Sequence, residues 1–462
     1  MTDAHLISLV AAELTDVLGA GRVSTTEAQR ELHGRGESYH PLAPPDLVVW
    51  PQSTEEVVAV VDRCRAHGVP LIPFGAGTSF EGQVSALAGG VCVDLTQMSR
   101  ILRISVEDMD ATVEAGVTRL QLDAALRPEG VFFPVDPGAD ATIGGMVATG
   151  ASGTTTVRYG AMRENIVSLT VVTAAGEVVR TRSRARKSSA GYDLTRLFIG
   201  SEGTLGVITE VTLRLHPTPE AISAAVCPFG SLSQAVACVV HTLQLGIPVA
   251  RIELLDEVQL DAINRRQDLD YQLAPTLFLE FHGSEREVRD QTEAVEAIAR
   301  EAGAIGFESA TGTADRRRLW EARHHAYEAA LALRPGSHGF VTDVCVPISQ
   351  LQLCIEETRR DLEQSGLLAP LVGHVGDGNF HLAILIDPDD AAELAAAQEL
   401  SGQLARRAIA LGGTCTGEHG VGYGKAKYLE LEYGPGGVRL MRAIKSALDP
   451  DGLLNPGKVL PD

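Results

Sequence analysis

A glycine-rich loop at residues 75–79 constrains the fold of this chain more than any other feature. The sequence Gly75-Ala76-Gly77-Thr78-Ser79 follows a predicted strand at 69–74 and resembles the first half of a dinucleotide-binding fingerprint. Phe80 stands where that fingerprint needs its third glycine, and residues 82–90 are expected to form a loop that leads into a strand at 91–95. A Rossmann phosphate site requires a strand, a tight turn and a helix in that order. The Rossmann fold is therefore excluded.

Three further glycine-rich stretches fall in the same half of the chain, at 134–138, 142–153 and 200–206. Glycine has no Cβ, so such segments let backbone N–H groups approach the phosphates and ring atoms of a long cofactor. Tight turns alone would explain any one of these stretches, but they explain four of them in one domain poorly. We therefore expect the first domain to bind an extended cofactor that contains a pyrophosphate.

The sequence Pro217-Thr218-Pro219 is the expected boundary between two domains, since 462 residues are too many for one ordinary hydrophobic core. Short strands and helices alternate before it, and strands alternate with longer helices after it, which indicates an α+β protein. The expected ranges are 1–40 for an N-terminal helical segment, 41–219 for the first domain, 220–437 for the second domain, and 438–462 for a C-terminal helix and loop that pack back on the first domain.

Capping residues and hydrophobic periodicity place the helices. Ser53 and Glu56 form a capping-box pattern, in which Glu56 reaches back to the helix start, and that helix is expected to stop at Gly68. Its buried face is predicted to consist of Val57, Val60, Val61 and Cys64. Further helices are expected at 4–18, 119–126, 232–245, 286–302, 315–333, 349–364, 390–411 and 438–448, and strands at 47–50, 112–116, 168–173 and 207–215.

The balance of charge excludes nucleic acid as a partner. Asp and Glu number 60 against 39 Lys and Arg, and a surface with a net charge of −21 repels phosphate backbones. One basic cluster stands out, and it is either a solvated loop or a docking patch for an acidic partner protein. It consists of Arg180, Arg182, Arg184, Arg186 and Lys187.

The seven cysteines are scattered and form no C-x-x-C pair, which argues against a disulfide framework and an iron–sulfur cluster. No run of 18 apolar residues is present, so no transmembrane segment is expected. These observations favour a cytoplasmic protein, with a peripheral position at a membrane as the alternative.

Two histidines and a later glutamate form the most specific chemical signal. His374 and His381 are seven residues apart, which would separate them by about 10 Å on a helix and place them on opposite faces of a strand. Gly376 and Gly378 lie between them, so the chain can fold back and both imidazoles can converge. With Glu418 they would form a two-histidine, one-carboxylate site that suits zinc, or manganese or iron. The alternative is a pair of hydrogen-bonded loop histidines.

The glycine-rich stretches, Arg158-Tyr159-Gly160 and the segment 201–208 together resemble the FAD domain of the vanillyl-alcohol oxidase/p-cresol methylhydroxylase (PCMH) superfamily. Within it, the chain is most similar to the FAD-linked D-lactate dehydrogenases that pass electrons to cytochromes. The resemblance implies a two-subdomain PCMH-type FAD-binding domain and an α+β substrate or cap domain with an antiparallel sheet. It also implies that FAD is not covalently attached, because Thr78 and Ser79 stand where some members carry a histidine.

By the same resemblance, residues 75–79 would hold the pyrophosphate and Ile208 would meet the adenine end. The full set of implied FAD contacts is Pro73, Gly75, Ala76, Gly77, Thr78, Ser79, Pro137, Thr142, Gly144, Gly145, Gly150, Ser152, Gly153, Glu202, Gly206, Ile208 and Asn455.

The implied reaction is the oxidation of a small D-2-hydroxy acid, in the first place D-lactate to pyruvate, with hydride transfer to flavin N5. Related dehydrogenases hold a divalent metal at positions that match His374, His381 and Glu418, and such an ion lowers the pKa of an oxygen that it binds. His419 is the expected general base. Arg323 matches the family's carboxylate-binding arginine, and an exposed helix arginine is the alternative.

The sequence favours a short substrate and leaves several candidates for the substrate and for the electron acceptor. Val341 and Ala383 are apolar where relatives that oxidise D-2-hydroxyglutarate tend to carry polar groups, which favours a short substrate. The alternatives are the flavin subunit of a glycolate oxidase, a D-2-hydroxyglutarate dehydrogenase, and a flavin-binding sensor without turnover. A cytochrome, an electron-transfer flavoprotein or a quinone-linked protein is the implied electron acceptor.

Overall fold

The computed structural model describes residues 4–461, which form two compact units built from interleaved parts of the chain. The first unit contains the residues up to Ser152, then Gly160–Thr218, and then the chain from Glu418 onward. The second contains Gly153–Tyr159 and Pro219–Gly417. The border after Thr218 lies inside the Pro217–Pro219 motif, whereas the border after Gly417 is not among the positions expected from the sequence. The expected domain ranges themselves remain a prediction.

One part of the first unit is a small sheet covered by helices α1 (Ala4–Leu18) and α3 (Thr54–His67). Its strands, in spatial order, are β1 (Val23–Ser24), β2 (Leu47–Val49), β4 (Val91–Asp94) and β3 (Leu71–Phe74), and the last three are parallel. The residues after β3 form a loop, and the next regular element is β4. This order confirms that the glycine loop at 75–79 is not a Rossmann turn.

The start of α3 differs from the predicted capping box. Ser53 Oγ accepts the backbone N–H of Glu56, as expected. The Glu56 carboxylate does not reach back to Ser53, because it forms two hydrogen bonds with Arg22, at 2.5 and 2.8 Å, and accepts the backbone N–H of Gln52. The predicted buried face of this helix and its end at Gly68, which has φ +63°, are confirmed.

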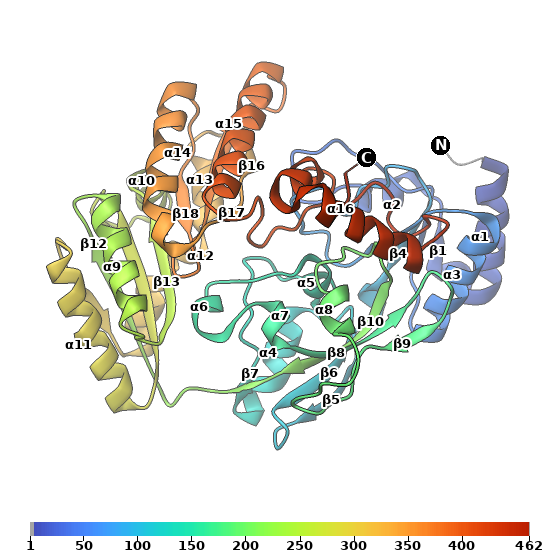
Figure 1. Ribbon diagram of the computed structural model, residues 1–462, viewed down its shortest axis with the longest axis horizontal. Helices are drawn as coiled ribbons and strands as arrows, with labels where there is room; N and C mark the ends of the chain where they lie inside the picture. Colours follow the sequence, from blue (N-terminus) through green and yellow to red (C-terminus); the bar gives the residue numbers. More distant parts are fainter. Residues whose placement is uncertain (1–3, 462) are drawn as a thin grey trace. The chain divides into compact units, whose positions relative to one another are not determined.

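The other part of the first unit is an antiparallel five-stranded sheet (Figure 1). Its strands, in spatial order, are β5 (Ile101–Ser105), β6 (Asp110–Glu114), β10 (Val207–Arg214), β8 (Ile166–Val172) and β9 (Val178–Arg180). Helices α4 (Arg119–Leu126), α5 (Ile143–Thr149) and α8 (Leu194–Phe198) contribute to its hydrophobic core. The strands predicted near 112, 168 and 207 are confirmed.

The second unit is an antiparallel sheet, as the family resemblance implies. Its strands, in spatial order, are β15 (Glu308–Ala310), β12 (Ala221–Pro228), β14 (Thr276–Gly283), β13 (Val249–Leu255), β18 (Leu371–Gly373), β19 (Asn379–Ile386) and β16 (His338–Val341), and β17 (Val344–Cys345) also pairs with β19.

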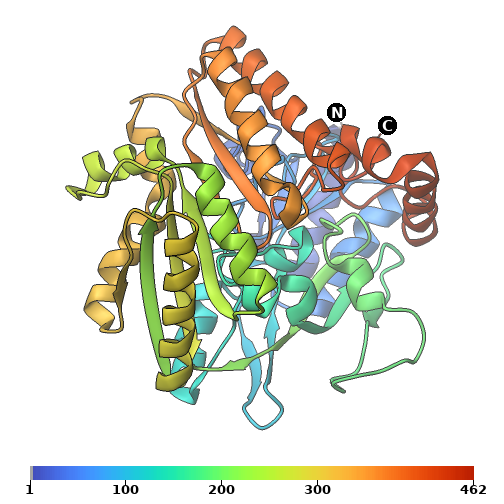
Figure 2. The same cartoon turned by 60° about the vertical axis from the view of Figure 1, so that its left-hand side comes forward.

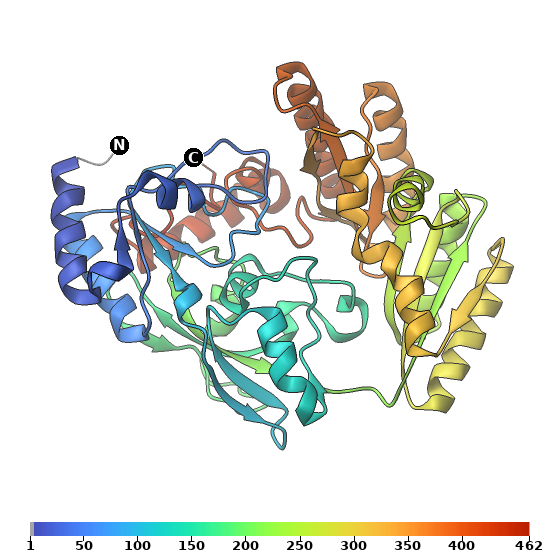
Figure 3. The ribbon, with the colours of Figure 1, turned by 180° about the vertical axis from the view of Figure 1, so that it is seen from behind.

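Helices cover both faces of this sheet. Helices α9 (Leu232–Gln244) and α11 (Glu285–Glu301) lie on one face, as Figure 2 shows. Helices α10 (Glu257–Gln267), α12 (Thr313–His324) and α13 (Ala326–Ala332) pack on the other face, which is visible from behind in Figure 3. Helices α14 (Leu351–Ser365) and α15 (Ala391–Ala410) complete the unit.

Two predicted helices differ from the structure. The single helix expected at 315–333 is broken at His325, which has φ −110° and ψ 23°. The C-terminal helix α16 (Leu429–Leu448) begins well before the expected residue 438, and Gly434 with Pro435 interrupts it. Among residues 4–461, no helix is long and apolar enough to cross a membrane.

A buried ion pair in the first unit gives a prediction about pH. His33 Nε2 lies 2.9 Å from Asp94 Oδ2, and Trp50 Nε1 donates to the same oxygen at 2.7 Å. Burial is the largest single effect and opposes the charged imidazole, but the hydrogen bond to Asp94, the hydrogen bond to the Gln29 carbonyl and the charge of Asp94 together outweigh it. The pKa of His33 is therefore raised from its ordinary value of 6.5. The pair therefore stabilises the folded state fully below pH 6.5, and this contribution is lost as the pH rises through the folded pKa.

We expect His33→Gln to lower the melting temperature more at about pH 6 than at about pH 8. Loss of this buried hydrogen bond should cost about 1–3 kcal/mol at the lower pH. Thermal unfolding of the wild-type protein and of His33→Gln across this pH range measures the difference between their melting temperatures. The exposed His241 on α9 offers a control, since His241→Gln removes an imidazole from the surface and should change the melting temperature only slightly. A difference in melting temperature between wild type and His33→Gln that is the same at every pH would contradict a stabilising ion pair between His33 and Asp94.

Candidate active site

The structure brings the three predicted metal ligands together. His374 directly follows β18, His381 lies within β19, and their rings stand 5.4 Å apart between centroids at an interplanar angle of 80°. Glu418 is the residue after Gly417, where the second unit ends. One donor atom from each of the three residues lies within 4.8 Å of the other two. The donor set of two imidazoles and a carboxylate fits a divalent transition metal.

A tight turn between the two strands produces this convergence. The N–H groups of Asp377 and Asn379 donate to the carbonyl of His374 at 3.0 and 3.3 Å. Gly378 has φ +79°, and a Cβ at this position would lie 2.1 Å from the carbonyl oxygen of Val346. Only glycine can occupy this position without moving the backbone.

Oxygen atoms behind the two imidazoles define which nitrogens face the candidate site. His374 Nδ1 lies 2.7 Å from Glu253 Oε1, and His381 Nδ1 lies 3.0 Å from the carbonyl oxygen of Thr342. Both oxygens are acceptors, so each Nδ1 is the donor, and in the neutral ring that metal binding requires each Nε2 then presents its lone pair. This is the tautomer that a metal ligand needs.

Glu253 is a functional candidate that the sequence reasoning missed. It lies in the middle of β13, and its side chain is 1% exposed. Burial alone would raise the pKa of its carboxyl, but His374 and Arg323 outweigh burial and hold that pKa below its usual value. The available sequence signal was a pair of charged residues, Arg251 and Glu253, on one face of an otherwise apolar strand.

Arg323, the predicted carboxylate-binding residue, lies on α12 and is largely buried. Its Nε donates to Glu253 Oε2 at 2.8 Å. One N–H of the guanidinium is therefore taken by the buried Glu253. The terminal N–H groups are the ones that a substrate carboxylate would contact. Substrate binding by Arg323 stays a prediction.

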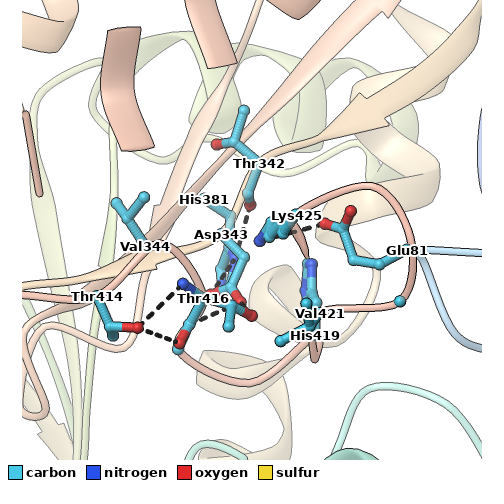
Figure 4. Close-up of polar contacts among 12 residues, drawn as sticks. Glu81, Thr342, Asp343, Val344, His381, Thr414, Thr416, His419, Val421 and Lys425 are labelled. Carbon is cyan, nitrogen blue, oxygen red and sulfur yellow. Dashed lines mark hydrogen bonds and ion pairs between the residues drawn. The ribbon is translucent and has the colours of Figure 1, made fainter. Parts of the chain in front are cut away.

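A second buried carboxylate, Asp343, holds the segment that precedes Glu418 (Figure 4). Asp343 accepts hydrogen bonds from Asn379 Nδ2 at 2.7 Å, from Thr416 Oγ1 at 2.8 Å and from the backbone N–H of Gly417 at 2.8 Å. These bonds tie the strand that carries His381 to the residue next to Glu418. The sequence reasoning did not single out Asp343 for this role.

In the first unit, the loop that carries Glu418 and His419 contacts the predicted flavin residue Ser152 and the residues that follow the 75–79 loop. Ser152 Oγ donates to Glu418 Oε2 at 2.5 Å. The carbonyl of His419 accepts from Gln83 Nε2 at 2.8 Å, and its imidazole stacks on Phe80 with 4.7 Å between ring centroids. His419, the predicted base, is thus placed by both its backbone and its ring.

Glu202, a predicted FAD contact, also holds this loop. Its carboxylate accepts the backbone N–H groups of Val421 at 2.6 Å and Gly422 at 2.8 Å. Burial raises the pKa of Glu202 to about 7. The ion pair between Lys425 and Glu81, at 3.1 Å, fixes the far end of the same loop (Figure 4).

Two predicted flavin residues, Ser79 and Asn455, and Ser201 beside the predicted contact Glu202 have polar atoms that a cofactor would satisfy. Ser79 Oγ, Ser201 Oγ and Asn455 Oδ1 are buried and have no hydrogen-bond partner among the residues that the structure describes. Asn455 itself is fixed, since its Nδ2 donates to the carbonyls of Gln83 and Glu202. These atoms come from three separate glycine-rich or loop segments, which fits a long polar ligand.

The other predicted FAD residues group in the first unit, with the exception of Gly153, which begins the short segment assigned to the second unit. Thr142 caps α5 by accepting the N–H of Gly145. A Cβ at Gly75 would lie 2.3 Å from Thr142 Oγ1, so the 75–79 loop and the start of α5 approach each other closely. The individual flavin contacts remain predictions.

Comparison with known families gives two matches that together span most of the chain. Residues 45–182 match the FAD binding domain, and residues 218–459 match the C-terminal domain of FAD linked oxidases. The cofactor expected from the glycine-rich stretches is therefore FAD.

Known proteins of similar sequence include two that are named D-lactate dehydrogenases. The chain is 51% identical to "Probable D-lactate dehydrogenase, mitochondrial" of Danio rerio, over 98% of this chain and 92% of that protein. It is 46% identical to "D-lactate dehydrogenase [cytochrome], mitochondrial" of Arabidopsis thaliana, over 99% of this chain and 80% of that protein.

Among solved structures, 4-ethylphenol oxidase from Gulosibacter chungangensis superposes with a TM-score of 0.81 at 22% identity, over 99% of this chain and 98% of that one. The structure of p-cresol methylhydroxylase superposes with a TM-score of 0.77 at 17% identity, over 99% of this chain and 97% of that one. These two likenesses confirm the predicted PCMH-type fold.

Proposed function

The chain belongs to the FAD-linked oxidases of the vanillyl-alcohol oxidase/PCMH superfamily and is an FAD-dependent D-2-hydroxy acid dehydrogenase, and from this premise we propose that it oxidises D-lactate to pyruvate with the help of a divalent metal. The proposal of a bound metal rests on one observation: candidate ligand atoms of His374, His381 and Glu418 lie within 4.8 Å of one another. Zinc suits this donor set best, with manganese and iron as alternatives.

The case for a short substrate rests on an apolar cross-strand pair. Val341 of β16 is the register partner of Ala383 of β19, so the two side chains lie on the same face of the sheet. A distal carboxylate placed against this pair would lose its hydration without gaining a partner, which is costly. D-lactate has only a methyl group there, and the two similar dehydrogenases are named for this substrate.

Each residue of the candidate site has a task in this reaction. The two imidazoles and Glu418 would hold the ion, which when bound stabilises negative charge on the hydroxyl oxygen of the substrate. His419 removes the hydroxyl proton. The terminal N–H groups of Arg323 hold the carboxylate. FAD, when bound, supplies N5 as the hydride acceptor.

The electron acceptor is proposed to be a cytochrome, because the name of the Arabidopsis relative includes one. An electron-transfer flavoprotein and a quinone-linked protein are the alternatives.

The basic cluster near β9 is a weaker docking candidate than its sequence suggests, since Arg184 is paired with Asp108 and Asp110. The seven cysteines are free, which suits the proposed reducing cytoplasm, with a peripheral position at a membrane as the alternative.

The test is anaerobic reduction of the bound flavin by a panel of hydroxy acids, before and after chelation. D-lactate should bleach the flavin and L-lactate should not. Chelation should remove most of the activity, and zinc or manganese should restore it. Faster bleaching by glycolate or by D-2-hydroxyglutarate would assign the enzyme to those substrates. No bleaching by any acid would favour a flavin-binding sensor.

A further inference from the structure

A buried glutamate joins the predicted substrate arginine to a predicted metal ligand. Glu253 uses one carboxylate oxygen for His374 Nδ1, at 2.7 Å, and the other for Arg323 Nε, at 2.8 Å. All three residues belong to the second unit. They form one continuous chain of hydrogen bonds from α12, through strand β13, to the turn after β18.

The charges along this chain depend on one another. A carboxylate that is 1% exposed is costly unless it is paired and hydrogen-bonded. Glu253 meets both conditions only while Arg323 occupies one oxygen and the imidazole N–H of His374 occupies the other. A carboxylate behind a metal-binding histidine fixes its tautomer and ring orientation and makes the opposite nitrogen a stronger ligand.

We propose that Glu253 is a positioning residue that couples Arg323 to the metal site, so that Arg323 raises the affinity for a divalent ion even when no substrate is bound. This inference rests on the proposed function, because it requires that His374 ligates a metal. It gives Arg323 a second role, which a residue that contacts only the substrate would not have.

A second glutamate on the same face of the sheet provides a matched control. Glu280 lies on β14, and its Oε1 lies 2.7 Å from His282 Nε2 and 3.5 Å from Arg251 Nη1. This trio also consists of a buried glutamate between a histidine and an arginine. The other nitrogen of His282 lies 2.8 Å from the Tyr159 hydroxyl, so this histidine has no nitrogen left for a metal.

The experiment measures zinc binding to the flavin-loaded enzyme after chelation and without substrate, by calorimetric titration. Glu253→Gln should weaken zinc binding about 10- to 100-fold. Arg323→Ala should weaken it on the order of 3- to 10-fold, and the double variant should bind no more weakly than Glu253→Gln alone. Glu280→Gln should bind zinc within about twofold of the wild-type protein. The flavin spectrum should stay the same throughout.

Two results would overturn the inference, namely wild-type zinc affinity in Arg323→Ala, which would leave this residue to the substrate alone, or wild-type affinity in Glu253→Gln. If Glu253→Gln does not fold, Arg323→Ala decides the question. If the wild-type protein itself binds no zinc or manganese, the proposed metal-assisted function fails, and the inference fails with it. The wild-type titration therefore separates the two failures.

Discussion

Replacing His419 by alanine should slow the reduction of the flavin by D-lactate about 10²- to 10⁴-fold, the effect of losing a general base. The substitution removes the imidazole and leaves its loop in place, because the loop is held by backbone groups. Gln83 donates to the carbonyl of His419, and Glu202 accepts the N–H groups of Val421 and Gly422. A single-turnover measurement in the absence of oxygen reports the chemical step directly.

The control for this variant is His241→Ala, which removes an exposed histidine in the second unit and should leave the rate unchanged. The flavin and metal contents of His419→Ala should match those of the wild-type protein, since neither Ser152 nor Glu418 loses its partner. A rate of flavin reduction close to the wild-type value would remove His419 from the role of base.

Replacing Gly378 by alanine should greatly lower the binding of the proposed metal and reduce turnover by about 10²-fold, as expected when reacting groups are displaced by an ångström. The added Cβ would lie 2.1 Å from the carbonyl oxygen of Val346, a backbone atom that cannot rotate away. The turn must therefore move, and the two predicted histidine ligands stand at its two ends. Metal content, measured on the purified variant by elemental analysis, is the direct test.

Gly366→Ala is the matched control for this effect. Gly366 has φ +68°, similar to the +79° of Gly378, but an added Cβ would have no described atom within 4 Å. This variant should lose about 1–2 kcal/mol from the left-handed backbone alone and keep its metal. If Gly378→Ala binds metal as well as Gly366→Ala does, the turn does not place the ligands.

The sequence predicted those elements whose signals are local. The end of α3 at Gly68 and the helix at 119–126 follow from caps and periodicity. The capping box failed because the carboxylate of Glu56 is taken by Arg22, a residue 34 positions away that no local pattern reveals. The break at His325 carries no proline or glycine, so the periodicity of α12 and α13 gave no sign of it.

The same distinction applies to the candidate site. His374 and His381 could be paired from the sequence because a short glycine turn joins them. Glu253 could not be paired with His374, since the two are 121 positions apart and meet only when β13 and β18 lie side by side. Asp343 was missed for the same reason, because its partners come from β19 and from the segment before Glu418.

The interleaving of the two units limits how this enzyme can be recombined with its relatives. The chain passes between the units after Ser152, Tyr159, Thr218 and Gly417. The short segment 153–159 contributes the Tyr159 hydroxyl to His282. A chimera that replaces only residues 219–417 would therefore combine the sheet of a relative with this protein's own segment 153–159. Exchange of substrate preference between relatives should succeed only when segments 153–159 and 219–417 are replaced together.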